Sequence, residues 1–97
     1  MTQQNKSTLR MSEVEALRKR MLLTISNMAE VLGVSRQGYY DWRNGRTIRP
    51  AREKEVRVRL KKLLNVMLAH DWPNPAVLDM EPDERFKHLT ALLDESE

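Results

Sequence analysis

The sequence predicts an all-α protein that folds as a compact bundle of five or six helices. Apolar residues recur at the three- and four-residue spacing of an amphipathic helix in the segments 11–22, 25–32, 50–70 and 82–93. Glycine and proline stand at the boundaries of these segments rather than inside them. The chain has no cysteine, so we expect neither a disulfide framework nor a Cys-ligated zinc ion. Its length permits one domain with an appended tail.

The first predicted helix follows a polar start. Residues 1–10 are expected to form a flexible arm, because they are polar and have few apolar side chains. Ser12 is the expected cap of the helix, and Glu13 and Glu15 are well placed for the positive end of its dipole. One apolar stripe consists of Met11, Val14, Leu17, Met21 and Leu22.

Residues 24–45 have the spacing of a helix-turn-helix. Thr24 is a candidate N-cap, and the left-handed conformation open to Gly33 can end the first helix. Ser35 is positioned to cap a second helix over 35–44, which Gly45 would end. The apolar face of the first helix, with i, i+3, i+4 and i+7 spacing, consists of Ile25, Met28, Ala29 and Leu32.

The second of these helices has two different faces. We expect Gly38, Tyr39 and Trp42 to be buried. The opposite face is expected to be exposed and consists of Arg36, Gln37, Tyr40, Asp41 and Asn44. Because this face is rich in groups that hydrogen-bond to base edges, a DNA-binding motif is favoured. A helical hairpin inside an unrelated small bundle is the alternative.

Charge is divided unevenly along the chain. Residues 1–62 hold 15 Lys and Arg against 6 Asp and Glu, and residues 63–97 hold 2 against 8, which gives +9 and −6 and the net charge of +3. The helix-turn-helix motif at 24–45 therefore lies in the basic half of the chain. Positive charge near the motif favours binding to DNA phosphates. Glu53 and Glu55 can pair locally with some of these cations. The basic run consists of Arg36, Arg43, Arg46, Arg49, Arg52, Lys54, Arg57, Arg59, Lys61 and Lys62.

Residues 28–35 (MAEVLGVS) and 42–46 (WRNGR) resemble the Cro and phage-repressor type of helix-turn-helix domain, a compact lambda-repressor-like bundle. The resemblance covers about residues 13–68. It implies that the start of the second helix contacts phosphate, that the third helix reads bases, and that the following loop returns to the DNA backbone. Carried over to this chain, the base contacts are Arg36, Gln37, Tyr40 and Asp41, and the phosphate contacts are Thr24, Ser26, Arg43, Asn44, Arg46 and Arg49.

The chain departs from that family at Gly38 and at the bulky pair Tyr39 and Tyr40. Asp41 also puts a negative charge close to phosphates. It would either accept from a cytosine amino group or hold Arg36 or Arg43 in place, and the second role is favoured. A local similarity connects residues 32–43 with the DNA-binding segment of some insertion-sequence transposases of the DDE class. The chain has no room for their catalytic domain, so both resemblances imply DNA binding.

A long helix follows, opened by Pro50 and uninterrupted by glycine or proline until Pro73. The predicted DNA-binding domain spans 11–70, and an acidic helical extension spans 71–97. The apolar face of the last helix either folds back near Trp72 or pairs with a second copy, and pairing is favoured. Its predicted dimer contacts are Phe86, Leu89, Leu92 and Leu93.

Together these patterns predict a DNA-binding transcriptional regulator, a homodimeric autorepressor that binds an inverted repeat through the helix at 35–44. The alternatives are an antitoxin whose acidic residues 80–97 cover a partner protein, and an accessory factor of a phage or mobile element. We expect no enzyme activity, no cofactor and no metal site, since His70 and His88 have no partner at ligand spacing. No apolar run reaches the length of a membrane span, which favours a location in the bacterial or phage-infected cytoplasm.

Overall fold

The computed structural model describes residues 10–95, and this part of the chain contains six helices and no strand. The prediction of an all-α bundle of five or six helices is confirmed. The predicted N-terminal arm, apart from Arg10, lies outside the described residues. None of the described helices is long and apolar enough to cross a bilayer. The helices are α1 (Met11–Arg20), α2 (Ile25–Leu32), α3 (Arg36–Arg43), α4 (Pro50–Ala69), α5 (Pro75–Leu78) and α6 (Pro82–Glu95).

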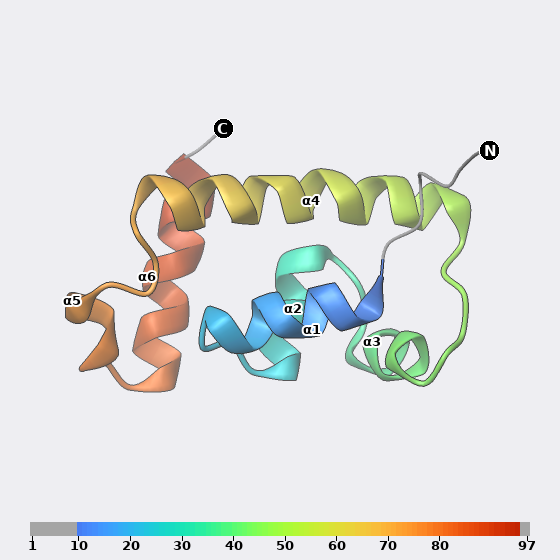
Figure 1. Cartoon of the computed structure of the whole chain (residues 1–97), viewed down its shortest axis with the longest axis horizontal. Coiled ribbons are helices and arrows are strands. Elements are labelled where there is room, and N and C mark those ends of the chain that lie inside the picture. Colours follow the sequence, from blue (N-terminus) through green and yellow to red (C-terminus); the bar gives the residue numbers. More distant parts are fainter. Residues whose placement is uncertain (1–9, 96–97) are drawn as a thin grey trace.

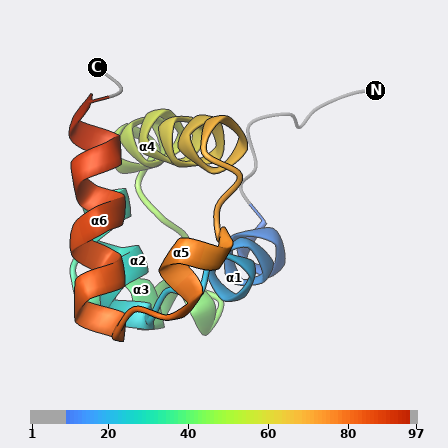
Figure 2. The same ribbon diagram turned by 90° about the vertical axis from the view of Figure 1, so that its left-hand side faces the viewer.

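The long helix α4 runs along one side of the molecule, and the shorter helices lie beneath it (Figure 1). The described chain measures 44 × 26 × 21 Å along its principal axes. Helix α3 lies toward one end of the long axis, and α5 and α6 lie toward the other (Figure 1). Seen along this axis, α6 and α1 occupy opposite sides of the space below α4 (Figure 2).

A single hydrophobic core joins all six helices or the turns between them. The side chains of Met28 and Leu32 on α2, Tyr39 on α3, Leu63 on α4 and Leu89 on α6 are all 0% exposed. Helix α4 packs against both α2 and α6. The C-terminal segment 71–97 therefore shares the core of the first helices in its described part.

The start and the end of α1 differ from the sequence expectation. Ser12 does not cap the helix, because the Arg10 carbonyl already accepts the backbone N–H groups of Glu13 and Val14 at 3.0 and 3.2 Å. Leu22 lies in the turn after α1 with a φ of +64°, and its side chain is 39% exposed. Leu23 takes its place in the core.

The C-terminal segment folds back onto its own chain. Trp72 is buried, and its indole Nε1–H donates a hydrogen bond to the Met21 carbonyl at 2.9 Å. Its ring stacks on His88 with 5.9 Å between the ring centroids. Leu89 is fully buried, and Phe86, Leu92 and Leu93 pack against the core. The fold-back alternative is therefore observed: Leu89 is covered within one chain, while Phe86, Leu92 and Leu93 are half-buried. Pairing with a second copy stays a prediction.

Candidate nucleic-acid interface

Helices α2 and α3 are bounded by the residues that the sequence suggested. The Thr24 hydroxyl accepts the Asn27 backbone N–H at 3.0 Å, and the Asn27 side chain accepts the Thr24 N–H at 3.1 Å, which completes a capping box. Gly33 ends α2 in the left-handed region with φ +76°. The Ser35 hydroxyl accepts the Gly38 N–H at 2.9 Å and caps α3. A turn of three residues thus joins the two helices.

The buried side of α3 is narrower than expected. Tyr39 is fully buried, whereas Gly38 and Trp42 are only half-buried. The Tyr39 and Trp42 rings meet edge to face, with 6.2 Å between their centroids. Arg36 and Gln37 are exposed on the opposite side. Helix α3 therefore packs against the core through Tyr39, and its first turn is exposed to solvent.

The base-contacting candidates Gln37 and Asp41 are joined to each other. The Gln37 amide Nε2–H donates to Asp41 Oδ1 at 3.0 Å, an i, i+4 contact on the surface of α3. The expectation that Asp41 holds an arginine is wrong, since the nearer partner lies one helical turn before it. Tyr40 and Asp41 are half-buried rather than exposed. Asp41 lines the concavity between α3 and the loop that follows it.

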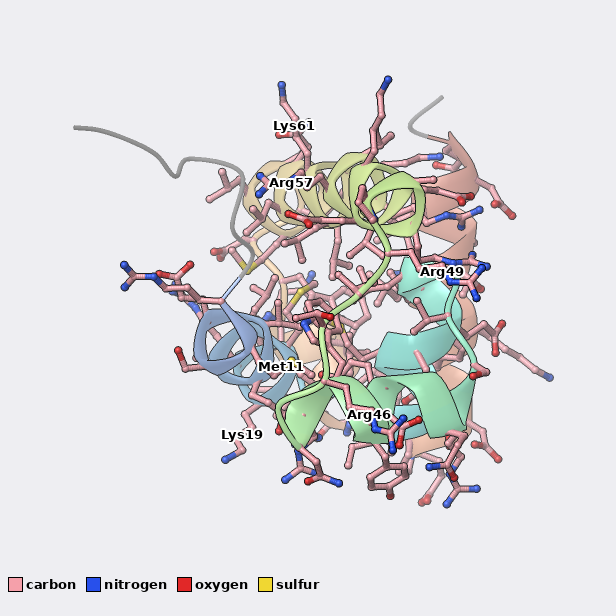
Figure 3. The ribbon with its side chains drawn as sticks, turned by 90° about the vertical axis from the view of Figure 1, so that its right-hand side faces the viewer. Met11, Lys19, Arg46, Arg49, Arg57 and Lys61 are labelled. Atoms are coloured by element: carbon pink, nitrogen blue, oxygen red, sulfur yellow. The ribbon has the colours of Figure 1, made fainter. Side chains whose placement is uncertain are left out.

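The phosphate-contacting candidates fall into two groups. Thr24 and Ser26 are exposed at the start of α2. The candidates exposed at the end of α3 and after it are Arg43, Asn44, Arg46 and Arg49. Figure 3 looks at the α3 end of the molecule and shows Arg46 and Arg49 on this face, with Arg57 and Lys61 on α4 above them. A concavity of about 540 Å³ separates α3 from the loop and from the start of α4. Its polar lining consists of Ser35, Asp41, Arg46, Thr47, Arg49 and Arg52.

The sequence analysis missed a polar network that connects α1 with α3. The Glu15 carboxylate accepts two hydrogen bonds from Arg18, both at 2.9 Å, and one from the Tyr39 hydroxyl at 2.6 Å. The Arg43 Nε atom lies 3.6 Å from Glu15 Oε1. The Glu15 side chain is only 15% exposed. Sequence spacing suggests the Glu15–Arg18 pair, but nothing local indicates that Tyr39 and Arg43 reach it.

These contacts shift two pKa values. The hydrogen bonds from Arg18, reinforced by that from Tyr39 and opposed by burial, lower the pKa of Glu15 from 4.5 to about 2. Burial and the hydrogen bond to the Glu15 carboxylate raise the pKa of the Tyr39 hydroxyl above its ordinary value. At neutral pH the network therefore consists of a carboxylate, two guanidinium groups and a neutral phenol.

Comparison of the chain with protein-family models, curated proteins and solved structures found no match. The resemblance to the Cro and phage-repressor domains stays a prediction, supported by the residues of α2, the turn and α3.

Proposed function

We propose that this protein is a sequence-specific DNA-binding transcriptional regulator that inserts α3 into the major groove. The observation that carries the proposal is the exposed first turn of α3, where Arg36 and Gln37 stand beside each other on a helix capped at a three-residue turn. A single α-helix fits the major groove, and side chains near the start of a recognition helix reach base edges.

The two exposed side chains suit different bases. Arginine forms a bidentate contact with guanine, and glutamine does so with adenine. The hydrogen bond to Asp41 holds the Gln37 amide in one orientation before DNA arrives. Such preorganisation lowers the conformational entropy that an ordered contact costs. We therefore assign most of the base discrimination to Arg36 and Gln37.

The arginines around the concavity are proposed to bind DNA phosphates, which does not depend on the base sequence. Arg46, Arg49 and Arg52 line it from the loop and from the first turn of α4. Arg52 also donates to the Gly33 carbonyl at 3.0 Å, which connects it to the turn between α2 and α3. Phosphates contacted here would release counterions, so affinity should fall steeply as salt rises.

We further infer that two copies repress transcription by binding an inverted repeat, in the cytoplasm of a bacterial or phage-infected cell. One α3 reads only a few base pairs, and a pair of copies would place two recognition helices in successive major grooves, ~34 Å apart. If the copies pair through the apolar face of α6, the half-buried Phe86, Leu92 and Leu93 would supply the contact. Leu89 would not, because it is buried within its own chain.

The proposal is tested by selecting sequences from a random duplex library with the full chain and measuring affinities for the selected site and for random DNA. We expect Arg36→Ala and Gln37→Ala to weaken specific binding by ~1 to 3 kcal/mol each, with little change on random DNA. Lys87→Ala, an exposed change on α6, is the matched control and should leave both affinities unchanged.

Two results would contradict the proposal. A chain that enriches no sequence, or variants that lose affinity equally on selected and random duplexes, would remove sequence-specific recognition by α3. A selected site without two-fold symmetry, bound by one copy, would reject only the pairing.

A further inference from the structure

We infer that Glu15 on α1 is a positioning residue for DNA recognition, which sets the rotation of α3 and holds Arg43 in place for the phosphate backbone. This inference rests on the proposed function. It goes beyond that function by locating a determinant of binding on a helix that carries none of the predicted DNA contacts.

The geometry of the carboxylate supports this role. Glu15 Oε2 accepts from Tyr39 at 2.6 Å, and Glu15 Oε1 lies 3.6 Å from Arg43 Nε. Tyr39 and Arg43 are one helical turn apart on α3, so one carboxylate holds the helix at two points along its axis. Contacts at two points restrict rotation of α3 about its axis, whereas burial of Tyr39 alone restricts mainly its distance from the core.

The network also reaches the exposed side of α3. The Arg43 side chain is 39% exposed, and its guanidinium lies 6.0 Å from the centre of the Tyr40 ring. Tyr40 is one of the predicted base contacts. A shift of Arg43 would therefore change its contact with Tyr40 on the surface expected to bind DNA.

Arg18 ties the carboxylate to the rest of the fold. Its Nη1–H donates to the Leu23 carbonyl at 2.9 Å, while its Nε and Nη2 groups bind both oxygens of Glu15. This bidentate contact fixes the carboxylate plane. The Glu15–Arg18 pair on α1 therefore contacts both the turn that precedes α2, at Leu23, and the buried side of α3, at Tyr39.

The network requires a carboxylate rather than an amide. All of its partners are donors toward Glu15, so the NH₂ group of a glutamine would face another donor. Glu15→Gln therefore keeps the size of the side chain while disrupting the geometry. Glu13→Gln, an exposed change on the same helix, is the matched control.

The test is a double-mutant cycle on the selected duplex with Glu15→Gln and Arg43→Ala. We expect Glu15→Gln to weaken binding about tenfold in the otherwise unchanged chain and less than about twofold when Arg43 is already alanine. Glu13→Gln should have no effect in either background. Equal losses in both backgrounds would overturn the inference, since a general effect on folding does not depend on Arg43.

A second measurement does not use DNA. In ¹H–¹⁵N spectra at neutral pH, we expect the Nε–H signal of Arg18, which donates to Glu15 at 2.9 Å, to be protected from solvent exchange and to lose that protection in Glu15→Gln. The Nε–H chemical shift of Arg43, whose Nε lies 3.6 Å from the carboxylate, should change in the same variant. Unchanged signals would overturn the inference. If Glu15→Gln does not fold, Tyr39→Phe removes one of the contacts while retaining the buried ring, and the same cycle with Arg43→Ala decides. If the unchanged chain selects no duplex, the proposed function fails, and the spectra still show whether the carboxylate holds Arg43.

Discussion

The two ends of the molecule are attached to the same core by different interactions. At one end, Glu15 on α1 holds α3 by accepting a hydrogen bond from Tyr39 and by an ion pair with Arg43. At the other, α5 and α6 are held by the burial of Val77 and Leu89 and by Trp72. Hydrogen-bonded ion pairs are directional, whereas apolar burial is not. The end proposed to meet DNA is therefore attached through an ionised carboxylate, whereas at the other end the hydrogen bond from Trp72 to the Met21 carbonyl accompanies apolar burial.

The two ends of the molecule should respond differently to a change in pH. The charged network depends on the ionisation of Glu15 and is sensitive to acid. The C-terminal end depends on apolar area removed from water, which pH leaves unchanged. The following predictions test this contrast, beginning with the largest expected effect.

Trp72→Ala should destabilise the fold most. We expect a loss of ~3 to 5 kcal/mol in the free energy of unfolding, because the change removes a buried indole and leaves a cavity. It also deprives the Met21 carbonyl of its donor. Urea unfolding followed by circular dichroism measures this loss. Leu78→Ala, at a side chain that is 54% exposed, is the control, and equal losses for both variants would show that burial does not hold the C-terminal end.

Acid should weaken the other end. The folded pKa of Glu15, about 2, lies below its ordinary value of 4.5. Its stabilisation is therefore complete above about pH 4.5 and is lost as the pH falls toward 2. We expect the unfolding free energy to fall between pH 7 and pH 2 by on the order of 2 kcal/mol more in the unchanged chain than in Glu15→Gln. Urea unfolding at a series of pH values measures it, and the same pH dependence in both proteins would contradict the role of Glu15.

Local features of the fold were predictable from the sequence because their causes lie within a few residues. The caps at Thr24 and Ser35 and the left-handed Gly33 depend on residues three or four positions apart. The same holds for the pairs of Arg57 with Glu53 and of Arg59 with Glu55 on α4. Helical periodicity identified core positions such as Val14, Met28 and Leu32. It missed Leu23, Val31 and Val77, which are also buried.

Features that join distant segments were not predictable in this way. Tyr39 is 24 positions from Glu15 and Trp72 is 51 positions from the Met21 carbonyl that it binds. The apolar face around Leu89 required a partner, but periodicity does not distinguish a second copy from the same chain. The assignment of Asp41 to an arginine was wrong: its carboxylate accepts from Gln37, four positions before it on α3.

The smallest expected effect separates a hydroxyl that caps a helix from one that does not. Thr24 and Ser26 were both predicted to bind phosphate, and both are exposed, but only the Thr24 hydroxyl caps α2. Thr24→Ala should therefore lower the unfolding free energy by about 1 kcal/mol, and Ser26→Ala by less than about 0.5 kcal/mol. Urea unfolding measures both, and equal stabilities would remove the cap from the interactions that hold α2. If both variants also weaken binding to random duplexes, the two hydroxyls act together at the phosphate backbone; a binding loss confined to Thr24→Ala would remove Ser26 from the phosphate contacts.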